Sequence, residues 1–298
     1  MLDKHFEQTE AELKAHLRSR NRVDRLMHVL GFLSAFFALL FLAVILYRVV
    51  SQSIGWLNLR FLTGKLSIFP EKAGISSVIV GSLLLMLVVI PITLFLGVTT
   101  AVYLEEYAGK GWFHQLIRTN ISNLAGVPSV IFGLLGLTVF SRFLGLGSSI
   151  LAGGLTLSLL VLPIVVVAGV EAIKAVPGYL RDASYALGAT RWTTIWRVVL
   201  PTAMPGILTG NILALSRAIG ETAPLVVLGI PALILKTPGS LMDDFTTLPI
   251  QIYYWTLDTV LTPEYANLAA ATIVVLLVLL FTLNAAAIVI RRKFARRY

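Results

Sequence analysis

The sequence predicts an all-α polytopic membrane protein with six transmembrane helices, and three observations indicate this fold class. Hydrophobic residues occupy 57% of the 298 positions and charged residues 13%, whereas a soluble domain is roughly 25% charged. Long uncharged intervals recur along the chain, and a helix needs ~20 apolar residues to cross a bilayer. These intervals lack the alternation of outer-membrane strands. Because backbone in lipid must satisfy its own hydrogen bonds, we expect a helical bundle.

Five uncharged intervals can each cross a bilayer unaided. They cover residues 26–47, 73–104, 119–141, 143–170 and 265–290. A sixth interval, 198–216, resumes after Arg217 and Glu221 as 222–235, so we expect one helix there with two charges inside it. The predicted helices lie at about 27–48, 75–103, 121–142, 149–170, 205–230 and 266–290.

Basic residues predict the orientation of these helices. Seventeen Lys and Arg lie in a tail at 1–25, in 104–120, in a loop at 171–204 and in a basic tail at 291–298, against five in the opposite connections. The positive-inside rule therefore places both termini of the 26–290 transmembrane domain in the cytoplasm. The net charge of +9 follows from this topology. It indicates a lipid environment and no nucleic-acid partner.

The N-terminal tail allows two interpretations. Phe6, Leu13 and Leu17 are spaced for one helical face, which fits either an amphipathic helix on the membrane surface or a solvated tail. We expect no cleaved leader, because 25 mostly polar residues precede a first span that is too long for a signal-peptide core.

Several classes of enzyme are excluded by the residues that are missing. The chain has no cysteine and four scattered histidines without ligand spacing, so a metal site or a hydrolase site is not expected. Gly64-Lys65 is followed by Leu66 and no glycine stands at 59, so the phosphate-binding loop GxxxxGK[ST] is absent. We therefore expect no enzyme activity and no cofactor in this chain.

The loop at 171–204 carries its own structural signals. Pro177 and Gly178 end the preceding helix, Tyr179 to Leu187 predicts a short helix, and Gly188 permits a turn. Thr190 can cap a second helix that stops near Leu200-Pro201. A helix-turn-helix hairpin of this kind has two interpretations: it docks on a partner, or it folds back on its own bundle.

A family resemblance favours docking. Asp182-Ala183-Ser184, three residues, Gly188, nine residues and Val198-Val199-Leu200-Pro201 resemble the EAA loop of bacterial ABC-transporter permeases, Glu-Ala-Ala-x3-Gly-x9-Ile-x-Leu-Pro. Asp, Ser and Val replace Glu, Ala and Ile. The resemblance implies a type I importer permease fold and a coupling helix seated in a separate ATPase subunit, which would bind ATP and Mg. The implied coupling residues are Asp182, Ala183, Ser184, Leu187 and Gly188.

Three further stretches narrow the resemblance. Gly126 to Gly133, Ala186 to Trp192 and Ser216 to Pro224 are similar to the PstA-type permeases of phosphate-specific ABC importers, over most of 70–290. The resemblance implies a subunit of a bacterial inner-membrane phosphate importer. Its implied partners are a second, homologous permease, an ATPase dimer and an extracytoplasmic phosphate-binding protein.

Arg217 and Glu221 are the predicted substrate-path residues. Each ionised side chain at the centre of a membrane helix costs ~2.5–3.5 kcal/mol, and Arg217 lies about 18 Å into a helix counted from Pro205 at 1.5 Å per residue. The spacing of four puts both on one face with Gly210 and Ala214. One interpretation is a structural ion pair. The other is an anion stop, in which Glu221 neutralises Arg217 until phosphate competes for the guanidinium.

Two alternative functions remain open. The chain is either a permease for another oxyanion, such as molybdate or sulfate, or a self-sufficient channel or secondary carrier in which the two charges line an autonomous pore. A self-sufficient channel or carrier has no partner subunit on which the 171–204 hairpin could dock. An intramembrane enzyme lacks any paired nucleophile and base.

Overall fold

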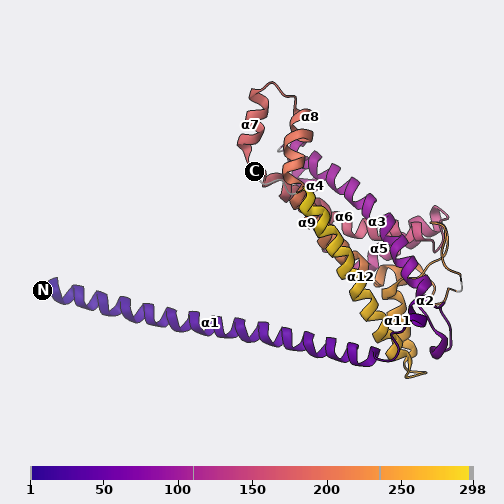
Figure 1. Ribbon diagram of the computed structural model, residues 1–298. Helices are drawn as coiled ribbons and strands as arrows, with labels where there is room; N and C mark the ends of the chain where they lie inside the picture. Colours follow the sequence, from indigo (N-terminus) through magenta and orange to yellow (C-terminus); the bar gives the residue numbers. More distant parts are fainter. Residues whose placement is uncertain (1, 110, 235, 295–298) are drawn as a thin grey trace. The chain divides into compact units, whose positions relative to one another are not determined.

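The computed structural model describes the backbone of residues 2–109, 111–234 and 236–294, and their side chains apart from those of 2–23, 113, 293 and 294. All named elements of these residues are helices, as Figure 1 shows, so the predicted all-α class is confirmed. The chain divides into two compact units, Met1–Ser51 and Gln52–Tyr298, and each is described by itself.

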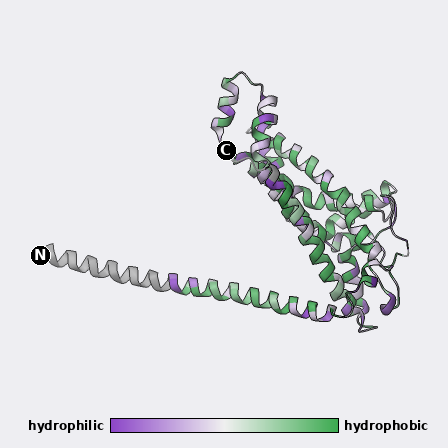
Figure 2. Ribbon diagram, in the orientation of Figure 1, coloured by the Kyte–Doolittle hydropathy of each residue, from purple (hydrophilic) through white to green (hydrophobic). Residues whose placement is uncertain are grey.

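The first unit is a single long helix. α1 (Leu2–Ser53) runs without a break through the predicted boundary between a tail at 1–25 and a span from residue 26. The segment contains no proline and one glycine, Gly31, so nothing in it ends a helix. Its Asp24–Ser53 part is long and apolar enough to cross a membrane, as the hydropathy colouring in Figure 2 shows. The side chains of Phe6, Leu13 and Leu17 lie outside the described residues.

The second unit contains the remaining helices. Its α-helices are α2 (Leu59–Thr63), α3 (Ser76–Val102), α4 (Trp112–Leu124), α5 (Ser129–Leu135), α6 (Ile150–Lys174), α7 (Gly178–Ala186), α8 (Arg191–Thr194), α9 (Leu200–Gly220), α10 (Ala223–Leu228), α11 (Leu248–Asp258) and α12 (Tyr265–Phe294). Short segments join them: the 3-10 helix η1 (Pro70–Lys72) and the π-helical η2 (Tyr103–Tyr107), η3 (Gly136–Phe143) and η4 (Ile195–Val199). Residues 295–298 of the predicted basic tail lie outside the described chain.

α6 lies at the centre of this unit, because it packs against both α3 and α9. Small residues bring the helices together. A Cβ added to Gly97 of α3 would lie 2.3 Å from Val165 of α6, and one added to Gly210 of α9 would lie 2.3 Å from Ala168. Neither separation is physically allowed, so these contacts hold only while the positions carry glycine.

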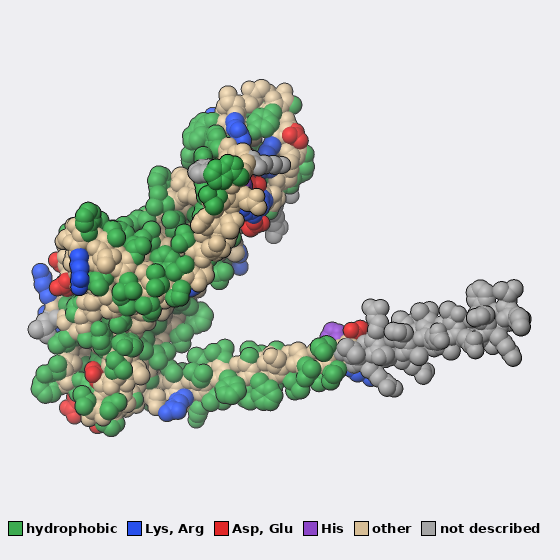
Figure 3. Space-filling view, turned by 180° about the vertical axis from the view of Figure 1, so that it is seen from behind, with side chains coloured by type: hydrophobic (Ala, Val, Ile, Leu, Met, Phe, Trp, Pro, Cys, Tyr) green, Lys and Arg blue, Asp and Glu red, His purple; other side chains and the backbone are tan. Residues whose placement is uncertain are grey.

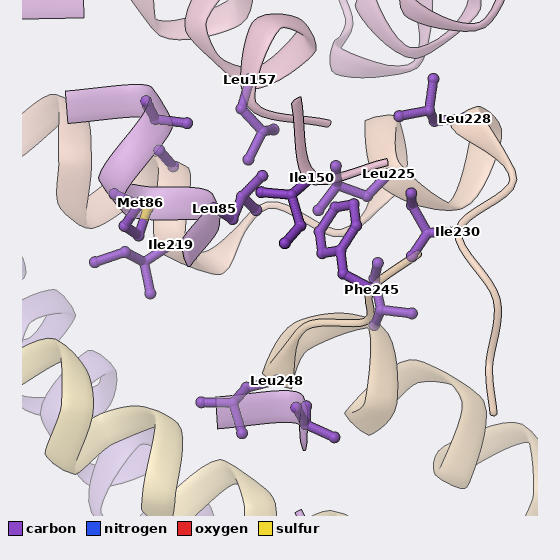
Figure 4. Close-up of a cluster of buried hydrophobic side chains, with 14 of the residues drawn as sticks. Leu85, Met86, Ile150, Leu157, Ile219, Leu225, Leu228, Ile230, Phe245 and Leu248 are labelled. Carbon is purple, nitrogen blue, oxygen red and sulfur yellow. The ribbon is translucent and has the colours of Figure 1, made fainter. Parts of the chain in front are cut away.

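The segment between α10 and α11 folds back into the bundle. Phe245 is fully buried among apolar side chains of α3, α6, α9 and α10 (Figure 4). Ser82 Oγ of α3 accepts the Leu248 backbone N–H at 2.9 Å. The Asp243 carboxylate accepts backbone N–H groups of Gly239 and Ser240 at 2.9 and 3.0 Å, and these hydrogen bonds hold its pKa below the ordinary value.

The predicted third span, 121–142, is not a single helix. α4 ends at Leu124, α5 begins at Ser129, and the two helical segments are bent by 103° at the break. Pro128 lacks a backbone N–H and disfavours α-helical backbone at Val127, and Gly126 has the weakest helix propensity of the ordinary residues. The sequence at this break therefore ends one helix and starts another in a new direction.

The predicted fifth span, about 205–230, is also wrong as a single helix. The helical segment begins at Arg191 and ends at Gly220, and Glu221 has an extended backbone with ψ 126°. α10 follows with Pro224 in its first turn. A helix continuing through Pro224 would place its ring against the carbonyl of Gly220, four residues earlier. The proline therefore separates Arg217 and Glu221 from the helix that follows them.

By length and composition, the described residues contain five helices able to cross a membrane, or six if the bent pair is one span. In Figure 3, apolar side chains cover the middle of the visible face of the second unit, and charged side chains gather toward its ends. This distribution is typical of a bundle surrounded by lipid.

Candidate functional site: an arginine at a helix end and an exposed hairpin

The predicted pair of charges forms in the structure. Arg217 Nε donates to Glu221 Oε1 at 3.1 Å. Arg217 lies in the last turn of α9 and Glu221 is its C-cap residue, so the pair closes the end of a helix instead of standing at the middle of one. A cation is favourable there, since the C-terminus of a helix carries partial negative charge.

The two side chains differ in exposure. Half of the Arg217 side chain is exposed, against 15% of Glu221. The carboxylate lies beside a void of about 10 Å³ lined mainly by apolar side chains such as Leu85, Met86 and Leu225, which is too small for an oxyanion. The guanidinium therefore presents its open side away from the core of this chain, and a ligand can reach it without displacing the core.

α12 fixes the neighbouring position on α9. The Ser216 hydroxyl lies 2.8 Å from Asn284 Oδ1 of α12 and 2.7 Å from the Ile212 carbonyl oxygen. Consecutive helical residues point about 100° apart, so this contact turns Arg217 away from α12. The contact between Asn284 and Ser216 is not predicted from the sequence. A single polar residue in an apolar run does not indicate which residue it will bond to.

The stripe predicted to continue the pair faces the interior of the bundle. Gly210 packs against Ala168 of α6, and Ala214 is 1% exposed. Both of these positions therefore lie on the interior face of α9. Within the described chain it is filled by α6, so it does not line an open path here.

The hairpin predicted in the 171–204 loop is present. α7 spans Gly178–Ala186, Gly188 has φ +80°, and the Thr190 hydroxyl accepts the Thr193 backbone N–H at 3.3 Å. The second helix does not stop at Leu200-Pro201, however. It continues through the π-helical η4 (Ile195–Val199) into α9. Pro201, which lacks a backbone N–H, therefore follows an irregular turn inside a longer helical segment.

α7 protrudes from the bundle but is also bonded to it. None of its residues is fully buried, whereas Arg181 bonds to Glu106 and Leu180 packs against apolar side chains of the bundle. Asp182, Ala183 and Gly188 are exposed and Leu187 is 89% exposed. Ser184 is half-buried and its Oγ lies 2.9 Å from Thr194 Oγ1 of α8, so this residue also holds the two arms of the hairpin together.

One polar contact beneath the hairpin was not predicted. Arg181 donates from Nε and Nη2 to Oε1 of Glu106, at 3.1 and 2.9 Å. Arg181 directly precedes the motif Asp182-Ala183-Ser184, and Glu106 is the second of two glutamates that follow a long uncharged run. These positions make both residues noticeable in the sequence. They are 75 positions apart, however, so the sequence does not indicate that they form a pair.

Comparison with known proteins assigns this arrangement to a family. The model of the family described as "Binding-protein-dependent transport system inner membrane component" matches residues 93–297, a range that includes the hairpin, Arg217 and Glu221. The chain belongs to this family.

Individual relatives cover most of the chain. It is similar to phosphate transport system permease protein PstA 1 of Mycobacterium tuberculosis (strain ATCC 25618 / H37Rv), with 38% identity over 242 residues, which are 77% of this chain and 74% of the relative. It is also similar to phosphate transport system permease protein PstA of Yersinia pestis, with 32% identity over 280 residues and 92% of each chain.

Solved structures show the same fold. An inward-facing MetNI methionine ABC transporter chain matches 72% of this chain and 94% of its own length, with a TM-score of 0.58 and 18% identity. A bacterial ABC transporter that imports the acidic polysaccharide alginate matches 74% of this chain and 80% of its own, with a TM-score of 0.54 and 16% identity. The predicted ABC importer permease fold is confirmed.

Family membership fixes the general setting of this protein. It is a multi-pass inner-membrane component of a binding-protein-dependent transport system and not an enzyme, and no cofactor is expected in such a subunit. ABC importer permeases work with an ATPase and with a solute-binding protein, so both kinds of partner are expected for this chain.

Proposed function

We propose that this chain is one permease subunit of an ATP-driven importer of inorganic phosphate. The observation that carries the proposal is Arg217, half exposed at the end of α9 and held 3.1 Å from Glu221. A guanidinium offers planar, paired N–H donors that match phosphate oxygens and keeps its charge when partly dehydrated. Relatives named as phosphate transport permeases support the choice of solute.

Glu221 makes the site a transient one. While no anion is present, its carboxylate compensates the guanidinium, so the membrane interior never contains an unpaired cation. An arriving phosphate competes with Glu221 for Arg217, and Glu221 recovers the guanidinium when the anion leaves. This competition keeps binding weak enough for passage.

The exposed side of Arg217 implies that a second, homologous permease completes the path. The void beside Glu221 is too small for phosphate, so the anion passes along the outer face of α9 and the opposite wall comes from the partner. The assembly then contains two permeases, an ATPase dimer and an extracytoplasmic phosphate-binding protein.

With both termini cytoplasmic, the α7 hairpin faces the ATPases and presents Asp182, Ala183, Ser184, Leu187 and Gly188 to them.

Arg217→Gln tests the proposal directly. Labelled phosphate uptake is measured in cells that lack their own phosphate importers and express the complete transport system with this chain. The variant should abolish ATP-dependent uptake while the complex still assembles. Arg142→Gln removes an exposed charge from η3 and should leave uptake unchanged. Normal uptake by the Arg217 variant would defeat the assignment of the anion site.

Competition separates the remaining oxyanions. Excess unlabelled phosphate should suppress the uptake, whereas sulfate and molybdate at equal concentration should not. Suppression by sulfate or molybdate alone would make the chain a permease for that anion. Phosphate flux through this chain in vesicles without any ATPase would instead establish a self-sufficient channel or carrier.

A further inference from the structure

The contact between the hairpin and the bundle is a buried ion pair. Glu106 lies in η2, the π-helical end of α3, and its side chain is 7% exposed, while that of Arg181 on α7 is 20% exposed. Another ion pair that joins separate elements at this end of the unit, Arg118 to Glu171, has side chains 43% and 59% exposed. Water screens an exposed pair, but a buried pair resists separation, because either charge left alone is poorly solvated.

Arg181 also holds the end of α6. Its Nη1 donates to the Val176 carbonyl oxygen at 2.8 Å, and its Nη2 donates to that of Ile173 at 3.0 Å. These carbonyls lie at the C-terminus of α6, where the last carbonyl groups lack intrahelical partners and favour a cation. One guanidinium therefore joins three elements: α7, the end of α6 and the end of α3.

The rest of α7 makes few firm contacts. None of its residues is fully buried, Ser184 bonds within the hairpin, to Thr194, and Leu180 packs against an apolar cluster of the bundle. A force applied to the exposed surface of α7 therefore reaches α3 and α6 through the apolar contact of Leu180 and through the directed bonds of Arg181. α3 then carries it along the bundle, since it packs tightly against α6 at Gly97.

We propose that the Arg181–Glu106 ion pair is the mechanical link through which movement of α7 by the ATPase drives the movement of α3 and α6 during transport. This inference rests on the proposed function, which makes α7 the element gripped by the ATPase. Arg181 and Glu106 are positioning residues, because neither side chain touches the transported anion. Without the pair, α7 moves with the ATPase while the membrane helices lag behind.

The test uses the complete importer in proteoliposomes, with its ATPase, second permease and phosphate-binding protein. Phosphate imported and ATP hydrolysed are measured together. Arg181→Gln and Glu106→Gln should each keep ATP hydrolysis within about twofold of the unmodified complex, while phosphate imported per ATP falls at least about fivefold. Arg118→Gln, in the exposed pair, should leave that ratio unchanged.

A charge swap separates linkage from folding. R181E/E106R restores the ion pair without the bonds to Ile173 and Val176, so it should recover at least about half of the lost import per ATP. The proposal would be overturned if the single variants retained the original ratio of phosphate imported to ATP hydrolysed. It would also be overturned if R181E/E106R assembled but recovered none of the lost import. Failure of both single variants and the swap to assemble would assign the pair to folding and also overturn it.

The outcome is distinguishable from failure of the proposed function. An unmodified complex that does not import phosphate with ATP would defeat the function itself. An unmodified complex that imports phosphate, together with a fully coupled Arg181→Gln variant, would defeat the link alone.

Discussion

At the scale of single residues, the environment of Arg217 differs from the one its sequence position suggests. The four-residue spacing predicted the contact with Glu221, and the atoms lie 3.1 Å apart. The distance from Pro205 predicted a charge deep within a helix, but Pro224 ends that helix at Gly220. A spacing of four residues, such as that of Arg217 and Glu221, can be counted directly in the sequence and brings two side chains of a helix together. The end of this helix at Gly220 depends on a clash with Pro224, four positions further on.

Glu221→Gln should slow import without preventing binding. The neutral amide no longer competes with phosphate for Arg217, so the anion is held more tightly and released later. We expect the maximal rate of phosphate import to fall about fivefold, equivalent to about 1 kcal/mol, with KM unchanged or lower. Initial rates of labelled uptake over a range of phosphate concentrations check this. A raised KM at an unchanged maximal rate would show that Glu221 helps to bind the anion.

At the scale of elements, the hairpin was the most predictable part of the molecule. Pro177, Gly188 and Thr190 each carry a local signal, and the structure uses them as a helix start, a left-handed turn and a cap. The third and fifth spans were predicted less well. Hydropathy reports whether a stretch is apolar, but it does not report a change of direction inside that stretch, and the 103° bend lies inside the predicted span, between Leu124 and Ser129.

Gly188→Val should weaken the hairpin and its hold on the ATPase. Gly188 has φ +80°, where a β-branched residue is strained by roughly 1–2 kcal/mol. We expect the variant to retain less ATPase than the unmodified chain when the complex is purified through this chain. The matched control is Gly178→Ala, since Gly178 has no positive φ and a Cβ there meets nothing within 4 Å. Equal loss of ATPase in both variants would contradict the role given to the turn.

At the scale of the whole molecule, composition predicted the fold class and the membrane setting, because it is a sum over many residues. The resemblance in the 171–204 loop supplied the family, and the match over 93–297 agrees with it. The link between Glu106 and Arg181 was not predictable. It joins residues 75 positions apart, and no periodicity or spacing rule connects two single charges over that distance.

The orientation of the chain can be tested with single cysteines, because the natural sequence has none. Ala186→Cys places a thiol at the exposed end of α7, and Ser240→Cys places one in the exposed 236–244 turn. With both termini cytoplasmic, a membrane-impermeant maleimide added to spheroplasts should label the thiol at 240 at once. It should label the thiol at 186 only after the membrane is permeabilised. The reverse pattern would invert the topology.

The π-helical end of α3 has a consequence for how this chain accommodates an extra residue. In η2 the Ala108 backbone N–H donates to Tyr103, five residues back, at 2.8 Å, so this turn holds one residue more than an α-helical turn. Each residue advances a helix by about 100°. Because the wide turn absorbs its extra residue, Glu106 keeps a phase in which its carboxylate reaches the guanidinium of Arg181. The same extra residue in a regular α-helical turn would rotate the carboxylate by about 100°, away from Arg181.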